Sequence, residues 1–183
     1  RVATLKGYSL KKMRTAEGAG VFSWVADTAK SIKLQYNTTT EEFTDINAAV
    51  ARIDALNDAT VDYTISIKPG EDSPFVDIAD FPEKAKSLTL EKESGEYLGI
   101  GIADSDNQVN IPVIIKGAGI STYSDLQTKD FTIESADFCY IYNKFDVDGT
   151  FTIGNAHVLA NNEMTATTLS CKPTDANYHI TFS

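Results

Sequence analysis

Two short acidic motifs are the residues best suited to chemistry in this chain of 183 residues. Asp104 and Asp106 are separated by one residue, and so are Asp146 and Asp148. Carboxylate oxygens at this spacing can serve as Ca²⁺ ligands. Neither motif continues into an EF-hand loop, which needs a glutamate at its twelfth position. We therefore expect no bound metal or other cofactor, with Ca²⁺ at these four aspartates as the alternative.

Paired carboxylates can also hydrolyse a glycosidic bond, one acting as acid and the other as base or nucleophile. Lyases of polysaccharides instead combine Ca²⁺ with a basic residue, and the three arginines, at positions 1, 14 and 52, precede the region that carries the acidic motifs. No Gly-x-Ser-x-Gly motif is present. We expect no catalytic activity, with a polysaccharide lyase or glycoside hydrolase using the acidic motifs as the alternative.

A row of aromatic residues is the clearest candidate for ligand binding. Residues 138–142 alternate in type, as on a strand whose side chains point to opposite faces in turn. Cys139 and Ile141 match Val158 and Ala160 in the following segment, which favours an inward direction for this pair. The outward side chains are then Phe138, Tyr140 and Tyr142. We expect these rings to contact a glycan or a protein, unless a loop or the N-terminal sheet covers the two tyrosines.

These candidates lie on a sequence that repeats. Phe131-Thr132-Ile133 returns further along the chain as Phe151-Thr152-Ile153. Related strand-like phrases begin at Tyr63, Ser87, Asn110 and Ala166, with turn-forming residues between them. A period of about 20 residues, each opening with a short strand, indicates a solenoid. A non-solenoid β-sandwich that binds carbohydrate stays open, because this period also fits one β-hairpin.

One helix is expected before the repeats. Thr44 can cap its N-terminus, Asp45 lies in the first turn, and Asn57 ends it. The apolar residues recur at helical spacing: Ile46, Ala49, Val50, Ile53 and Leu56. Such a face can cover the open end of a solenoid. We therefore divide the chain into a small β region, 1–43, and a capping helix with β-helix rungs, 44–183.

The composition limits the partners. Sixteen Lys and Arg stand against 26 Asp and Glu, so the net charge is −10. Such a surface repels phosphate backbones and anionic lipid, so nucleic acid is an unsuitable partner. No apolar run reaches the roughly 18 residues that span a bilayer, which argues against membrane insertion. The two cysteines, Cys139 and Cys171, are too few to indicate a disulfide framework, and we expect two free thiols that are buried as small apolar residues, with one disulfide as the alternative.

The sequence also resembles a known group of proteins. Ala3-Thr4-Leu5-Lys6-Gly7-Tyr8-Ser9-Leu10 is similar to a phrase in large modular secreted proteins of anaerobic Gram-positive bacteria. The run Gly149-Thr150-Phe151-Thr152-Ile153-Gly154-Asn155-Ala156-His157-Val158 resembles their β-helical repeats. The resemblance departs after Leu10, at Lys11 to Gly18. It implies export and a pectin-lyase-like right-handed parallel β-helix, and it implies no activity.

Together these observations predict a mainly β protein: a short right-handed parallel β-helix with an N-terminal capping helix and a small N-terminal β region. We expect an extracellular structural or adhesion module within a larger cell-surface or secreted protein. Its expected partner is a glycan or a surface protein.

Overall fold

The computed structural model describes residues 8–14, 20–26, 31–69, 75–93, 97–104, 106–160, 163–175 and 177–182. The chain forms two compact units, Arg1–Lys30 and Ser31–Ser183. In the first unit, β1 (Tyr8–Arg14) and β2 (Gly20–Ala26) pair in antiparallel register.

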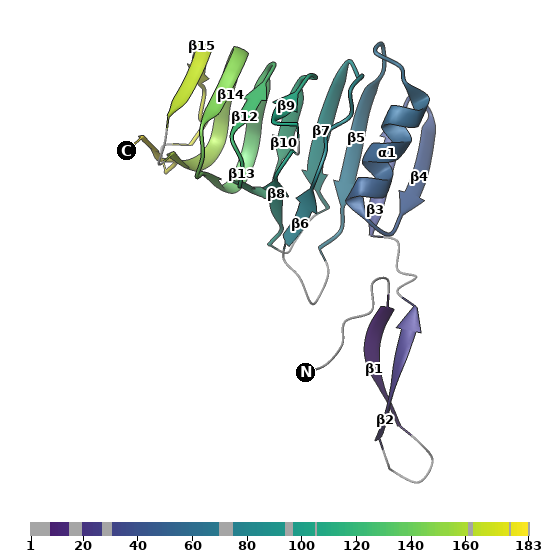
Figure 1. The fold of residues 1–183 in the computed structure, drawn as a ribbon. Helices are drawn as coiled ribbons and strands as arrows, with labels where there is room; N and C mark the ends of the chain where they lie inside the picture. Colours follow the sequence, from purple (N-terminus) through teal and green to yellow (C-terminus); the bar gives the residue numbers. More distant parts are fainter. Residues whose placement is uncertain are drawn as a thin grey trace. The chain divides into compact units, whose positions relative to one another are not determined.

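The second unit is a β-solenoid with about five turns in residues 75–181, so the predicted fold class is confirmed (Figure 1). The described residues of this unit include one helix, α1 (Ile46–Leu56). Its strands are β3 (Ile32–Tyr36), β4 (Thr39–Phe43), β5 (Asp62–Ile67), β6 (Phe75–Ile78), β7 (Ser87–Lys92), β8 (Gly99–Ile102), β9 (Gln108–Val109), β10 (Val113–Lys116), β11 (Gly119–Thr122), β12 (Leu126–Thr128), β13 (Phe131–Ile141), β14 (Phe145–Ala160), β15 (Met164–Cys171) and β16 (Ile180–Phe182).

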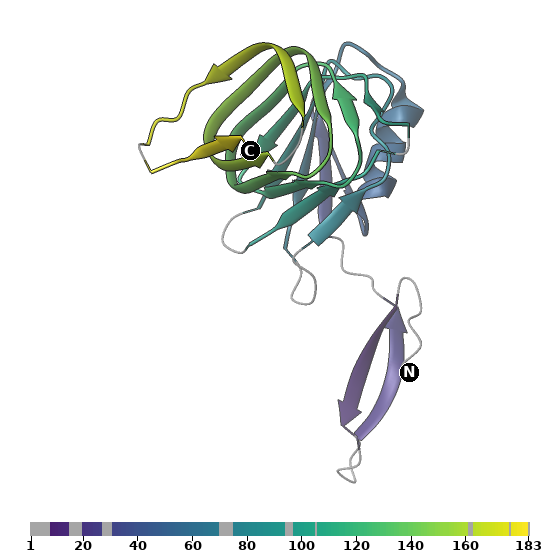
Figure 2. The same cartoon turned by 60° about the vertical axis from the view of Figure 1, so that its left-hand side comes forward.

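The turns stack three parallel ladders, which we call faces A, B and C (Figure 2). Face A contains β5, β7, β10 and parts of β13, β14 and β15. Face B contains β6, β8, β11, parts of β13 and β14, and β16. Face C contains β9, β12 and the first parts of β14 and β15. The long strands β13, β14 and β15 therefore contribute to more than one face.

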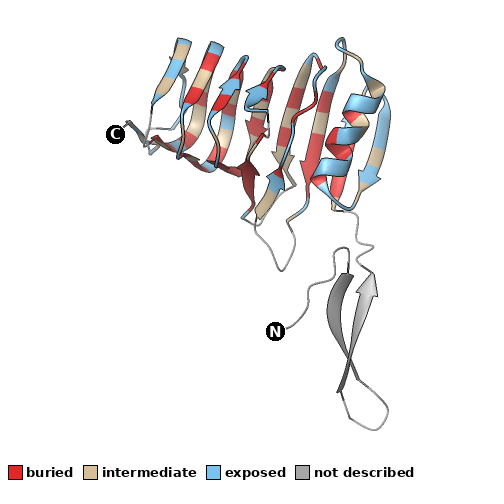
Figure 3. Ribbon diagram, viewed as in Figure 1, coloured by how far each residue is buried: buried red, intermediate tan, exposed pale blue. Residues whose placement is uncertain are grey.

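The core is a set of columns in which each turn places one apolar residue over the last. On face A, Leu88, Val113, Phe131 and Phe151 align in register and are buried. Figure 3 shows this alternation as buried bands along the strands. Removing such side chains from water is the main favourable term in folding. The repeating phrase in the sequence is therefore the signature of one core column.

The register of the early turns differs from the expected one. The repeat predicts that Ile111 follows Leu88 in the core column, but Leu88 pairs with Val113 instead. Val113 in turn pairs with Phe131, so the turn before Val113 is longer than the turn after it. The prediction failed because Ile111 is also apolar and buried and precedes Val113 by two residues, the spacing of same-side residues on a strand, although β10 begins only at Val113.

The helix is present, and its apolar face is buried at Ile46, Ala49, Val50 and Ile53. It contacts β3, β4, β5 and β6, at the N-terminal end of the second unit (Figure 1), which supports the capping role in part. Asp45, not Thr44, is the N-cap, because its side chain accepts hydrogen bonds from the backbone N–H groups of residues 47 and 48. Asn57 ends the helix in the left-handed conformation.

The boundary between the units differs from the one at residue 43. The strands β3 and β4 do not belong to a separate N-terminal region, because β3 pairs with β5 and extends face A in antiparallel register. Leu34 of β3 is fully buried opposite Ile65. The first unit is therefore limited to residues 1–30.

Candidate functional site

The aromatic row predicted at residues 138–142 lies on the outer side of face B. Cys139 pairs with Val158 and Ile141 with Ala160, and all four side chains are buried, so the predicted inward partners are confirmed. Alternation along β13 then places the neighbouring aromatic side chains on the outside.

The three predicted aromatic residues differ in exposure. Phe138 is only 8% exposed, Tyr140 is half-buried and Tyr142 is 43% exposed. The rings of Phe138 and Tyr140 stack with centroids 4.8 Å apart, and those of Tyr140 and Tyr142 lie 5.9 Å apart. Phe138 is therefore the buried member of the row, packed against Tyr140, and Tyr142 is the most exposed of the three.

Two aromatic residues from earlier turns complete the row. Tyr97 stacks on Phe138 with centroids 5.4 Å apart, and Phe75 lies 6.2 Å from Tyr97 and 6.4 Å from Phe138. Burial raises the pKa of the Tyr97 phenol, which therefore stays neutral at physiological pH. These contacts make the row a packed cluster on the outer side of the solenoid.

Glycines beneath the cluster allow the rings to approach the sheet. A Cβ on Gly99 would lie 2.5 Å from the Phe75 ring, and one on Gly119 would lie 2.0 Å from the Phe138 ring. Both distances are below any normal carbon–carbon contact. Face B therefore provides a floor without side chains at these positions, and the rings lie over it.

Two exposed tyrosines that lie outside residues 138–142 were not predicted. Tyr97 is 45% exposed and Tyr123 is 50% exposed. Tyr123 directly follows β11, where Thr122 pairs with Ile141, so it occupies the position equivalent to Tyr142 one turn earlier. We define the aromatic surface as Phe75, Tyr97, Tyr123, Phe138, Tyr140 and Tyr142.

Two carboxylates of described residues lie beside this surface. Asp77 is exposed, and its Oδ1 would contact a Cβ at Gly101, beside the Tyr123 ring. Asp137 is exposed and accepts a hydrogen bond of 3.0 Å from Lys92, whose side chain is only 14% exposed. Lys92 and Asp137 therefore form an ion pair, in which the positive charge of Lys92 is balanced.

The acidic motif at residues 104–106 has a structural role. Asp104 is buried, and its two carboxylate oxygens accept hydrogen bonds from the backbone N–H of Phe81 at 2.9 Å and of Asp106 at 3.0 Å. A buried carboxylate that is bonded in this way fixes the local loop. Asp106 is exposed.

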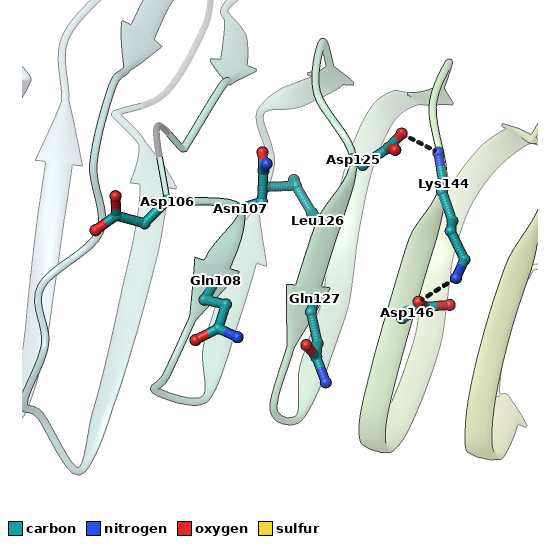
Figure 4. A pocket seen from close by; sticks show the side chains of 8 residues that line it. All are labelled: Asp106, Asn107, Gln108, Asp125, Leu126, Gln127, Lys144 and Asp146. Carbon is teal, nitrogen blue, oxygen red and sulfur yellow. Dashed lines mark hydrogen bonds and ion pairs between the residues drawn. The ribbon is translucent and has the colours of Figure 1, made fainter.

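The two acidic motifs nevertheless reach one pocket, shown in Figure 4. Asp106 and Asp146 both line this shallow depression on face C, which has a volume of about 220 Å³. The Lys144 Nζ lies 2.9 Å from Asp146, and the Lys144 backbone N–H donates to Asp125 at 3.0 Å. Carboxylates that are distant in sequence are thus brought to one side of the solenoid.

The other motif, at residues 146–148, lies within β14 and not in a turn. Asp146 accepts hydrogen bonds from Thr165 and from Lys144, and both lower the pKa of the Asp146 carboxyl. Asp148 accepts a hydrogen bond of 3.0 Å from Gln127. Gly149 is needed for space, because a Cβ there would lie 2.2 Å from the Asp130 carboxylate.

Metal ligation has no assembled site in the described part of the chain, where no three His, Cys, Asp or Glu side chains are grouped to hold an ion. Cys139 and Cys171 are both free thiols. Cys139 is buried, and burial raises the pKa of its thiol to about 12. Cys171 is exposed, contrary to the expectation that both are buried. The helix found among the described residues is too short to cross a membrane.

No family model, curated protein or solved structure matches this chain.

Proposed function

We propose that this protein is a non-catalytic extracellular structural or adhesion module that binds a glycan chain through the aromatic surface. The observation that carries the proposal is the exposure of Tyr97, Tyr123 and Tyr142, each between 43% and 50%, on the outer side of face B. Phe138 packs against Tyr97, and Tyr140 packs against Tyr142. Large exposed aromatic patches on a soluble fold commonly mark interaction sites.

The chemistry of tyrosine fits a sugar ligand. A tyrosine ring has an apolar body and a polar hydroxyl, so it can contact the C–H side of a sugar ring while donating or accepting a hydrogen bond. Tyr97 packs against Phe75 and Phe138, and Tyr142 packs against Tyr140, so these two exposed rings are held in place before binding. A surface organised in advance loses less conformational entropy when a ligand binds.

The charge favours a neutral glycan. The chain carries a net charge of −10, and the Asp77 carboxylate is exposed close to the aromatic surface. A polymer of uronic acids would meet repulsion there. The extracellular location and the place within a larger surface protein belong to the same proposal, and they rest on the resemblance of the sequence to secreted β-helical modules. A surface protein is the other ligand class to be tested.

The experiment is a binding panel of neutral β-glucan, mannan and xylan, with polygalacturonate as the anionic comparison. We expect the wild type to bind a neutral polymer, and Tyr97→Ala/Tyr123→Ala/Tyr142→Ala to bind at least about tenfold more weakly. The matched control is Thr40→Ala/Glu42→Ala, which trims exposed side chains on β4, away from both the aromatic surface and the face C pocket, and should leave binding unchanged. Wild type that binds no polymer, or a triple variant that binds normally, would contradict the proposal.

A second candidate function is cleavage of a polysaccharide on face C. The observation that favours it is the shared pocket of Asp106 and Asp146. The test is release of new reducing ends, or of unsaturated products, from the same panel. Activity that is lost in Asp106→Asn/Asp146→Asn would establish this function in place of the non-catalytic one.

A further inference from the structure

The C-terminal end of the solenoid exposes the last layer of its core. In the core columns, Phe151 is fully buried but Leu169, the residue stacked on it by β15, is 45% exposed. Ile153 is fully buried, and Cys171 above it is exposed. The apolar columns therefore end with one side of their last member open.

The edge strand at this end lacks the features that normally prevent strand pairing. Among the described residues, β15 pairs only with β14, so one edge of this strand has no β partner. Its sequence, MTATTLSC, contains no charge and no proline. Natural sheets usually protect such edges with charged residues, proline or a covering segment.

The opposite end of the second unit does have such protection. The edge strand β4 is antiparallel, contains Glu41 and Glu42, and lies against α1. Glu41 is also paired with Arg52 of the helix, at 3.0 Å. The two ends are therefore built differently, and the β15 end is the one suited to pairing.

The strand β15 can pair with a second copy of itself. Met164, Ala166, Leu169 and Cys171 all continue inward columns, because the register of β14 and β15 shifts between Val147 and Thr150. In an antiparallel pair with a two-fold axis between positions 167 and 168, Ala166 lies opposite Leu169 of the second copy. Met164 then lies opposite Cys171. Every inward position meets an inward position, so both cores become continuous.

The charge distribution also favours contact between two copies at the β15 end. Two copies with a net charge of −10 each repel one another over most of their surfaces, whereas β15 is uncharged. We propose that this protein forms a two-fold symmetric dimer in which the β15 edges of two copies pair antiparallel, C-terminal end to C-terminal end. The proposal does not depend on the aromatic surface, which lies on face B.

The first test is molar mass in solution, measured by light scattering over a concentration series. We expect the wild type to be dimeric, and Leu169→Lys to be monomeric, because two lysines would be placed in the uncharged interface. The matched control is Thr40→Lys, which places a lysine at an exposed position of the edge strand β4, at the opposite end of the second unit, and should stay dimeric. A wild type that is monomeric at all concentrations, or a Leu169→Lys variant that stays dimeric, would overturn the proposal.

The second test fixes the register. Met164→Cys should form disulfides with Cys171 of the other copy, giving a covalent dimer on non-reducing electrophoresis. Positions 164 and 171 of one chain are the first and last residues of β15 and lie on faces C and A, so they are too far apart to bond with each other. Cross-linking should disappear in Met164→Cys/Cys171→Ser. No covalent dimer in the first variant, or a persistent one in the second, would refute this arrangement.

Discussion

Phe75 and Phe138 meet with ring centroids 6.4 Å apart, although two strands, β8 and β11, lie between the strands that carry them. The rings reach each other because both intervening strands have a glycine at the equivalent position, Gly99 and Gly119. The aromatic surface is therefore built into the stacking of four successive strands.

Gly119→Ala tests whether the position of the Phe138 ring requires a residue without a side chain at position 119. We expect the free energy of unfolding to fall by about 1–3 kcal/mol, the usual cost of forcing extra volume into a packed site. The added Cβ would lie 2.0 Å from the Phe138 ring. Urea unfolding of the variant and the wild type measures the difference.

A double-mutant cycle provides the control. In a Phe138→Ala background the clash is gone, so Gly119→Ala should cost much less there than in the wild type. An equal cost in both backgrounds would show that the loss comes from the backbone at Gly119 and not from the ring.

The columns of the core predict a gradient of mutational cost along the solenoid. We expect Phe151→Ala to destabilise the fold by about 3–5 kcal/mol, since this ring is fully buried. Leu169→Ala, in the same column but 45% exposed in a single chain, should cost about 1 kcal/mol or less when unfolding is measured at protein concentrations at which the chain is monomeric. Both values come from denaturant unfolding of the purified variants, and equal costs would contradict the open end described for β15.

Part of this fold could be predicted because a solenoid repeats its core in the sequence. Phe131 and Phe151 stack directly, so the spacing between the two copies of the phrase is the length of one turn. The inward direction of Cys139 followed from the same logic, since its partner Val158 is the equivalent residue of the next turn. Local alternation and period were sufficient for these residues.

Other features depend on turn length, which the period does not determine. Tyr97 and Tyr123 lie just outside the strands, so alternation gave no direction for their side chains. Asp146 and Gly149 have the composition of a turn, yet they lie in β14 because the chain there follows the strand of the previous turn. Aligning Tyr123 with Tyr142, its equivalent in the next turn, was the available signal for the missed tyrosine.

The two cysteines should differ sharply in reactivity. Cys171 is exposed, whereas burial raises the pKa of Cys139 to about 12, so Cys139 is a protonated, inaccessible thiol at pH 8. At protein concentrations at which the chain is monomeric, we expect a chromogenic disulfide reagent to titrate one thiol per native chain and two after unfolding in urea. Cys171→Ser should reduce the native count to none. Two thiols that react in the native wild type would contradict the burial of Cys139.

Asp146 should make stability depend on pH in the acid range. Its hydrogen bond from Thr165, and then that from Lys144, lower the pKa of the carboxyl in the folded protein, whereas the pKa of an unfolded aspartate is about 3.9. The resulting stabilisation is complete above the unfolded pKa and is lost as the pH falls through the lower folded pKa.

We expect Asp146→Asn to lower the urea midpoint at pH 7, and this difference to shrink as the pH is lowered below about 4. Thr165→Val, which removes the larger cause, should reproduce most of the effect, and Lys144→Gln less of it. A deficit in Asp146→Asn that stays constant from pH 7 to pH 3 would mean that lost packing, not the ionised carboxylate, explains the change.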